Sequence, residues 1–495
     1  MKRLVIAIFI IFASFLTFSL YRTFAYDTSV VEETPSTTDL EYTFKIGNSS
    51  IKQITVDSGE TKYYDVVLGN PNPAKISYGV YYEMVSPSTK PDGFSIEYTS
   101  KSTGESTGKV DKEGNITLNL VVTNTSSSTV TVKLGTVAGY VNGGELTLNS
   151  GQEYIPEKVL TASEYIMSLN DGTTGDSGSG VYKVRHDAIP ADSSATGEII
   201  EATDDYRYYG KNPNNYICLD KNSDNTCEDR HLYRIIGSMR EDSDNIYKLK
   251  VVKATPLTDG TTSTFSWDCK KNDSQVKLMV ATEDENFNCN WSHNIWNSST
   301  EDSSLMQILN NTWLNGKAVK NYGNSYNGET VDFSNYSPSS QERKIINENS
   351  IYYLGGTDTY YIEDEQAYIY ERGKNISNGS NNYWIGTIGL IYPSDYIYIS
   401  GKECYFNKTA DCNDKNWIWN TCENLNTSNK LIWTITPYTG TSGKAFCLYQ
   451  NRSDGIMSYP IFVSGSIFPT FYLKPEVVIT DGTGEETNHF TVSIE

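Results

Sequence analysis

Histidine is scarce in this chain of 495 residues, which contains only four. They are dispersed at His186, His231, His293 and His489, without an HExxH or HxH pairing. Zinc sites draw on clustered His and Cys ligands, so this dispersion argues against a zinc centre. It also leaves little of the general acid–base machinery that enzymes use near neutral pH.

Several other signatures are missing. The sequence has no CxxC pair, no P-loop, no GxGxxG motif after a strand and no GxSxG nucleophile elbow. It has no run of Lys and Arg beyond the N-terminus, and 40 basic residues face 61 acidic ones, for a net charge of −21. Such a surface repels nucleic-acid phosphates, so we expect no nucleic-acid partner.

The only long apolar run lies at the start of the chain. Lys2 and Arg3 precede the run LVIAIFIIFASFLTFSL at 4–20, and Thr23-Phe24-Ala25 resembles a small-residue cleavage site. Residues 1–25 therefore predict export, either as a removed signal peptide or as a retained N-terminal membrane anchor. Residues 26–39 are polar and indicate a stalk. In both cases the rest of the chain is extracytoplasmic, at the cell surface or secreted.

Cysteine usage agrees with export. The chain has eight cysteines, all between positions 218 and 447. An exported chain meets an oxidising environment, which favours a disulfide framework over a metal site. The spacings fall into four local couples, and we expect neighbours to pair. The disulfide candidates are Cys218, Cys227, Cys269, Cys289, Cys404, Cys412, Cys422 and Cys447.

Residues 40–155 alternate between apolar and polar side chains with a period of two. Short strand-like runs separated by turn residues, without a helical pattern, predict an immunoglobulin-like β-sandwich. We expect this domain to act as a spacer that projects the following domain outward. The runs are LEYTFKIG (40–47), IKQITVD (51–57), TKYYDVVLG (61–69), KISYGVYYEM (75–84), FSIEYT (94–99), ITLNLVVTN (116–124) and TVTVKLGTVAGY (129–140).

Residues 156–204 predict a helix followed by a linker. The segment 157–169 (EKVLTASEYIMSL) has apolar residues at helical spacing, and Asn170-Asp171-Gly172 ends it. The stretch 170–180 is rich in Gly, Ser, Thr and Asp. Such composition is typical of a linker, which we expect to continue irregularly to about residue 204.

Residues 205–495 predict a mixed α+β head domain stapled by disulfides. One helix is expected from Ser303 to Asn315, where apolar residues share a face and Gly316 follows as a stop signal. Ser339 and Glu342 have the spacing of a capping box that opens a second helix. Short β runs surround both helices, which is the pattern of an α+β domain.

The head also carries an ordered series of motifs. These are YRYYGKNPNNY (206–216), YRIIG (233–237), YERG (370–373), GLIYPSDY (389–396), WTITP (433–437) and PTFYL (469–473). Over about residues 157–495 they resemble an uncharacterised domain family of secreted and cell-surface proteins from Gram-positive gut bacteria. That family usually has Arg-Pro before its final strand, whereas this chain has Phe468 in the arginine position. The resemblance implies an extracytoplasmic location but no reaction. A C-type-lectin-like head is an analogy that we draw from the irregular β pattern.

One loop of the head has the spacing of a calcium site. Oxygen-bearing side chains at alternate positions converge on one ion in such loops, with a carbonyl and a later carboxylate completing the shell. His231 stands where a bidentate Glu belongs, so a hydrophilic hairpin tip closed by Cys218 and Cys227 is the alternative. The calcium candidates are Asp220, Asn222, Asp224, Thr226 and Glu228.

Tryptophan supplies the other candidate site. Trp384, Trp417 and Trp419 lie in segments rich in Asn, and exposed rings beside amides bind sugar rings by stacking. Trp417 and Trp419 alternate in DKNWIWN, which places both on one face of a strand. Core packing is the alternative for these rings, and we expect it for Trp433 in the apolar run IWTI.

Together these features favour a surface-displayed binding or adhesion protein whose head engages a glycan or another surface ligand. The only expected cofactor is calcium, and the N-terminal segment contacts the membrane if it is not cleaved. A secreted hydrolase acting on glycans or peptidoglycan is the first alternative. A structural component of the cell envelope is the second.

Overall fold

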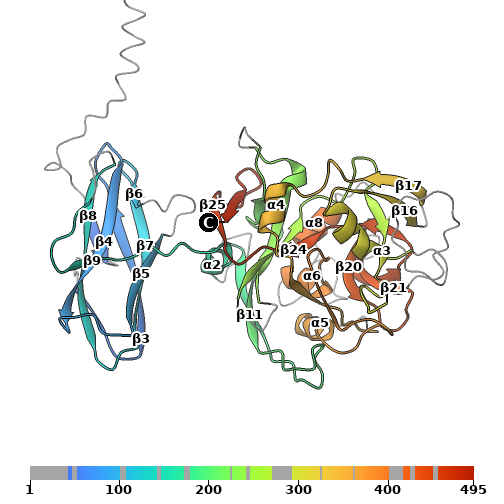
Figure 1. The fold of residues 1–495 in the computed structure, drawn as a ribbon, viewed down its shortest axis with the longest axis horizontal. Coiled ribbons are helices and arrows are strands. Elements are labelled where there is room, and N and C mark those ends of the chain that lie inside the picture. The colour runs from blue at the N-terminus through green and yellow to red at the C-terminus, as the bar shows by residue number, and fades with distance from the viewer. Residues whose placement is uncertain are drawn as a thin grey trace, which may run out of the picture. The chain divides into compact units, whose positions relative to one another are not determined.

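The computed structural model describes residues 43–46, 53–100, 108–141, 146–171, 179–222, 224, 226–240, 246–269, 293–300, 302–323, 326–359, 363–400, 416–423, 430–449 and 455–494. The chain divides into two compact units, one ending at Val159 and the other beginning at Leu160 (Figure 1). We call them the sandwich and the head. The expected signal segment 1–25 and stalk 26–39 lie outside the described residues.

The sandwich consists of two antiparallel sheets. One sheet has the order β1-β3-β7-β5, and the other has the order β2-β8-β4-β6 with β9 paired to β4. The strands are β1 (Thr43–Ile46), β2 (Gln53–Val56), β3 (Glu60–Gly69), β4 (Ile76–Ser86), β5 (Phe94–Ser100), β6 (Lys109–Val110), β7 (Asn115–Asn124), β8 (Val130–Tyr140) and β9 (Gln152–Tyr154).

Alternation of side chains builds the sandwich core. In β7 the buried positions Leu118, Leu120 and Val122 alternate with half-buried ones, because successive side chains of a strand point to opposite faces. Both sheets contribute to one apolar cluster. Its edge is closed by the buried Asn124, whose amide donates to the Val56 carbonyl at 2.9 Å. All seven predicted strand runs are confirmed as strands.

The largest sheet of the head has eight strands. Its main order is β10-β11-β13-β12-β26-β25, and β14 joins β13 to β24. A Cβ at Gly237 would collide with the Tyr206 carbonyl of β11, so the β13 bulge beside this residue requires glycine. The strands are β10 (Val181–His186), β11 (Thr203–Tyr208), β12 (Tyr216–Cys218), β13 (Leu232–Met239), β14 (Lys248–Lys253), β24 (Thr470–Tyr472), β25 (Val477–Asp481) and β26 (Phe490–Ile494).

A second head sheet has five strands in the order β15-β23-β20-β21-β22, and two further two-stranded sheets pair β16 with β17 and β18 with β19. Its central strand β20 is buried along its whole length. The strands are β15 (Thr264–Ser266), β16 (Ala318–Gly323), β17 (Tyr326–Asp332), β18 (Ser350–Tyr353), β19 (Tyr383–Gly386), β20 (Leu431–Pro437), β21 (Lys444–Tyr449), β22 (Ile456–Pro460) and β23 (Ser464–Ser466).

The helices of the head are short and begin at specific caps. Thr161 forms a capping box with Glu164 for α2, and Ser339 forms the expected box with Glu342 for α4. The expected helix at 303–315 is split between α3 and the π-helical η4, and Gly316 follows with a φ of 62°. The helices are α2 (Ala162–Ser168), η2 (Asp229–His231), α3 (Ser304–Gln307), η4 (Ile308–Trp313), α4 (Ser340–Ile345), α5 (Asp364–Glu371), α6 (Pro393–Ile399) and α8 (Trp417–Glu423).

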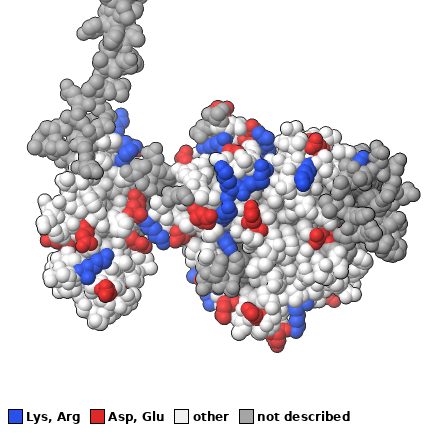
Figure 2. Space-filling model, viewed as in Figure 1, with Lys and Arg blue, Asp and Glu red and all other residues white. Residues whose placement is uncertain are grey.

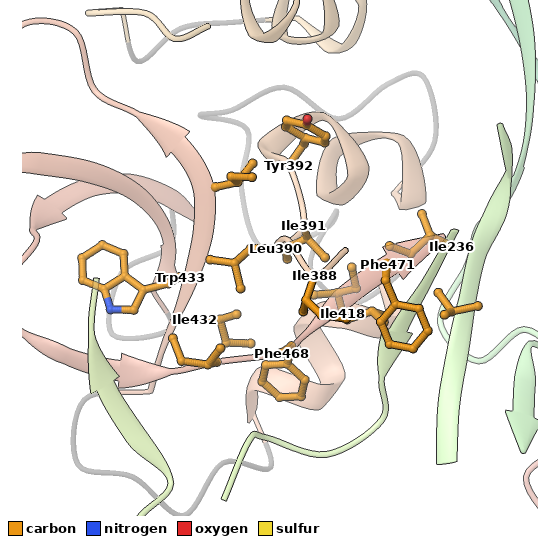
Figure 3. Packing of buried hydrophobic residues seen from close by; sticks show 14 of the residues in the cluster. Ile236, Ile388, Leu390, Ile391, Tyr392, Ile418, Ile432, Trp433, Phe468 and Phe471 are labelled. Atoms are coloured by element: carbon orange, nitrogen blue, oxygen red, sulfur yellow. The ribbon is translucent and has the colours of Figure 1, made fainter. Parts of the chain in front are cut away.

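A segment that enters α6 passes through the middle of the head core. Gly389 bridges Thr470, the first residue of β24, while the Ile391 carbonyl accepts from the backbone N–H of Ile435 on β20. Figure 3 shows the segment's apolar side chains between Trp433 on one side and Phe471 on the other. Both large sheets therefore share one core, which also buries Trp433 as predicted.

The predicted linker through residue 204 is wrong in part. Residues 181–186 form β10, which pairs along its length with β11 (Thr203–Tyr208), so this segment belongs to the head sheet. The run VYKVRH has polar residues between apolar ones, which is a strand pattern. The stretch rich in Gly and Ser before this run obscures that pattern. Within the described residues, no helix has the length and apolar character needed to cross a bilayer.

Candidate functional site

The head buries a cluster of charged side chains. The Arg207 guanidinium on β11 donates to Asp205 Oδ2 at 2.7 Å and to Asp395 Oδ1 at 2.9 Å. Lys250 Nζ on β14 lies 2.8 Å from the other oxygen of Asp395. All four side chains are buried, so each charge depends on its partners. Burial by itself raises the pKa of Asp395, but Lys250 and Arg207 hold that pKa below its ordinary value.

His186 lies at the end of this cluster between two carboxylates. Its Nε2 is 3.0 Å from Asp205 Oδ2, its Nδ1 is 2.8 Å from Glu365 Oε2, and its ring stacks on Tyr368 at 3.6 Å between centroids. Burial favours the neutral imidazole, but the Asp205 carboxylate and the hydrogen bonds of both acids outweigh it and raise the pKa of His186. The imidazole therefore ties β10 to α5.

Glu371 and Ser394 form a third part of the cluster. Ser394 donates to the Glu371 carboxylate through Oγ at 2.5 Å and through its backbone N–H at 2.9 Å. Burial raises the pKa of Glu371 to about 7 even though Arg372 Nη1 lies 3.6 Å away. The Arg372 guanidinium stacks over the Tyr368 ring at 3.4 Å.

This buried cluster accounts for three of the six ordered motifs. Arg207, Glu371 and Asp395 come from YRYYGKNPNNY, YERG and GLIYPSDY, which meet here although 188 residues separate Arg207 from Asp395. A nucleophile or acid must reach a substrate, and these side chains are at most 2% exposed. The geometry assigns these three residues to holding β11, α5 and α6 together.

An open groove of about 860 Å³ lies on another part of the head surface. It exists because β12 pairs with β26 only up to Cys218, whereas β26 continues to Ile494. Its lining consists of segment 218–221, three residues of α4 (Gln341, Lys344, Ile345), Lys474 and Glu476, Thr480 and Asp481 of β25, and segment 491–494 of β26. The volume lies within the range of about 300–1,000 Å³ that ligand sites occupy.

Two contacts place α4 on the groove wall. Glu342 Oε2, buried, lies 2.9 Å from His231 Nδ1, so α4 is held against the start of β13. On the other side, the Lys474 backbone N–H donates to the Ile345 carbonyl at 2.8 Å. Lys344 and Lys474 are therefore fixed on neighbouring segments.

The groove brings together three lysines, Lys221, Lys344 and Lys474. Among the described residues, no carboxylate lies within ion-pair distance of their ammonium groups, and Lys344 Nζ donates only to Gln341 Oε1 at 3.0 Å. Figure 2 shows Lys and Arg side chains gathered near α4 and β25, with carboxylates beside them. The carboxylates in the groove are Asp220, Glu476 and Asp481.

The predicted calcium loop is a hydrogen-bonded hairpin tip in its described part. Asp224 Oδ1 accepts from the backbone N–H and the hydroxyl of Thr226, and Glu228 accepts from Arg230 at 2.6 Å. The Asn222 N–H donates to the Thr226 carbonyl, and Asp220 lines the groove. No group of three or more His, Cys, Asp or Glu in the described part of the chain is arranged to hold a metal ion. Calcium binding stays a prediction.

The prediction that Trp417 and Trp419 are exposed on a strand is wrong. They begin α8, because Asn416 Oδ1 accepts from the N–H groups of Ile418 and Trp419 and so opens a helix. Trp417 is 2% exposed and lies under the Arg234 guanidinium, and Trp419 is 5% exposed. Neither ring is available to stack on a sugar.

The third predicted stacking residue, Trp384 on β19, is half-buried and therefore differs from Trp417 and Trp419. Its ring lies 5.3 Å from Tyr352 and 6.1 Å from Trp296 between centroids, on the core side of the β18–β19 strand pair. Tyr383 and Ile385, its neighbours along the strand, are the exposed ones. Only part of the Trp384 ring meets solvent.

The predicted disulfide between Cys218 and Cys227 is confirmed. Cys269 is also disulfide-bonded, and Cys447 is buried on β21. Cys289, Cys404 and Cys412 lie outside the described residues, as does the side chain of Cys422. The bond at Cys218 fixes the loop that carries Asp220 and Lys221 into the groove.

Sequence reasoning missed the groove. Lys221, Lys344 and Lys474 are spread over more than half of the head, and no local pattern connects them. Only the capping box of α4 was visible in the sequence, and it shows where the helix begins but not what it faces. No family model, no curated protein and no solved structure matches this chain.

Proposed function

We propose that this chain is an extracytoplasmic, surface-displayed binding protein whose head holds a ligand in the groove between α4 (Ser340–Ile345) and the β25–β26 hairpin. In this proposal residues 1–25 export or anchor the chain, and residues 26–39 form a stalk. The sandwich, taken as immunoglobulin-like, is a spacer, and the head is taken as C-type-lectin-like. The resemblance to secreted domains of gut bacteria supports the same location.

The groove is the observation that carries the proposal. Its walls present ammonium, carboxylate, amide and hydroxyl groups together, and polar groups converging in a concave site are what a ligand site offers. Its hydroxyl pair, Thr480 Oγ1 and Thr491 Oγ1 at 3.1 Å, lies on the solvent side of the β25–β26 hairpin. A ligand in the groove therefore meets side chains from rigid strands and a capped helix.

A hydrolase is the second candidate, because Glu476 and Asp481 both line the groove. Glycoside hydrolysis uses two carboxylates, one of which keeps its proton because its surroundings are apolar. Both side chains are exposed to solvent, which does not supply such surroundings. The exposed setting favours binding without transformation.

The test compares two matched substitutions. Thr480→Trp fills the groove at an exposed cross-strand threonine pair, and Thr55→Trp changes the corresponding exposed pair with Thr131 in the sandwich, at 3.0 Å. The purified chain and both variants are applied to an array of acidic and neutral glycans. We expect Thr480→Trp to weaken binding about tenfold or more, as loss of a central contact does, and Thr55→Trp to leave binding unchanged.

Other outcomes separate the alternatives. New reducing ends released from an array glycan, and lost in Glu476→Gln, would replace binding by hydrolysis. If Thr480→Trp does not weaken binding, the ligand site lies outside the groove. An array without any bound glycan would leave the structural role in the envelope as the better account.

A further inference from the structure

We infer that the ligand of the groove is a polyanionic glycan, a hydroxyl-rich polymer that bears carboxylate or phosphate groups. This inference rests on the proposed function and names the ligand class of the same site. Its first support is the three ammonium groups of Lys221, Lys344 and Lys474. They come from the loop after β12, from α4 and from the turn before β25.

The ammonium groups of these lysines form no ion pairs within the described part of the protein. None of the three has an ion-pair partner there, although the groove also contains Asp220, Glu476 and Asp481. Lys62, Lys75 and Lys183, in contrast, each lie within about 3 Å of a carboxylate. Ammonium groups gathered in a concave site without partners are complementary to the negative charges of a ligand.

The other side chains of the groove favour one class of polyanion over another. The carboxylates of Asp220 and Asp481, the amide of Gln341 and the hydroxyls of Thr480 and Ser493 accept or donate hydrogen bonds. Sugar hydroxyls satisfy such groups, whereas the backbone of DNA has no hydroxyls to offer them. Among the described residues that line the groove, none has an aromatic ring to stack on bases.

The net charge of the chain limits how such a polymer binds. At −21 the protein as a whole repels polyanions, so attraction is confined to the neighbourhood of the three lysines. At physiological ionic strength charges act over about 8 Å, which is short enough for the groove to act independently of the rest of the surface. Binding should therefore weaken as salt is added.

The experiment measures binding of the purified chain to polygalacturonate and to the same polymer with its carboxylates methyl-esterified. We expect esterification to weaken binding about tenfold or more, since a single hydrogen bond to a charged group contributes about that factor or more. Lys344→Gln and Lys474→Gln should each weaken binding to polygalacturonate about fivefold. Lys317→Gln, an exposed lysine outside the groove, should not.

Further probes identify which charged group of the ligand the groove binds. They also distinguish a failure of this inference from a failure of the proposed function. Polyglycerol phosphate tests phosphate in place of carboxylate, and lysine-dependent binding of either polymer supports the inference. Tighter binding of a DNA oligonucleotide would overturn it. Equal binding of the esterified polymer, lost in Thr480→Trp, would overturn the ligand class but keep the groove as a binding site. If neither acidic polymer bound while glycans of the array still did, the ligand class would likewise be overturned and the groove would remain a binding site.

Discussion

The sandwich and the head bury different chemistry. In the described part of the sandwich no Asp, Glu, Lys, Arg or His is buried, and its core is apolar apart from a few Asn and Thr. The head core encloses Asp205, Arg207, Lys250, Asp395 and other ionisable groups. An apolar core needs only an alternating pattern, whereas every buried charge needs a partner with suitable geometry. The head is therefore the unit whose stability depends on individual pairs.

The largest difference should follow removal of one buried charge. Asp395→Ala leaves Arg207 and Lys250 buried without their shared carboxylate, which should lower the free energy of unfolding of the head by about 3–5 kcal/mol. Glu60→Ala removes the exposed partner of Lys62 in the sandwich and should have no measurable effect. Chemical denaturation measures both. A small loss for Asp395→Ala would mean that the buried cluster does not hold the head together.

The two cores should respond independently to cavities. Trp417→Ala should lower the unfolding free energy of the head by about 3–4 kcal/mol, because its ring is almost fully buried. Leu118→Ala should lower that of the sandwich by about 2–4 kcal/mol. Scanning calorimetry should show each variant shifting one transition only. A Trp417→Ala chain that melts like the unchanged protein but binds glycan weakly would restore the stacking hypothesis.

The sandwich and the head also differ in their cysteine content. All eight cysteines lie in the head, and the bond between Cys218 and Cys227 spans a separation of nine residues. Replacing both by Ala should lower head stability by about 2.5 kcal/mol in the chain-entropy account, and sandwich stability should not change. The same variant should weaken glycan binding, because Lys221 follows Cys218 into the groove. Unchanged head stability would contradict this role for the bond.

The smallest expected effect is a pH dependence of the head alone, since all four histidines lie there. The pKa of His186 is raised in the folded chain, so its contribution is fully present below the unfolded pKa of about 6.5 and is lost as pH rises through the folded pKa. Melting temperatures of the head between pH 6 and 9 should fall, and His186→Gln should reduce that fall. A head of constant stability across this window would contradict the raised pKa.

Sequence and structure agree where one local rule decides the outcome. The alternation in 40–140 places every predicted strand of the sandwich, and Ser339 with Glu342 places the start of α4, because both signals act within a few residues. The alternation of Trp417 and Trp419 predicts a strand, but two alternating rings fit the first turn of a helix equally well, and the structure has a helix there. The charges of Arg207 and Asp395 gave no sign of burial, since their pairing crosses 188 residues.

Backbone hydrogen exchange, measured with and without polygalacturonate, tests the central claim that the head holds its ligand in the groove. We predict slower exchange on adding the polymer in three segments: Gln341–Ile345 of α4, 474–481 and Thr491–Ile494 of β26. Exchange in the sandwich and in the β18–β19 strand pair should not change. Slower exchange confined to the sandwich, or to the strand pair that carries Tyr383 and Trp384, would contradict binding in the groove.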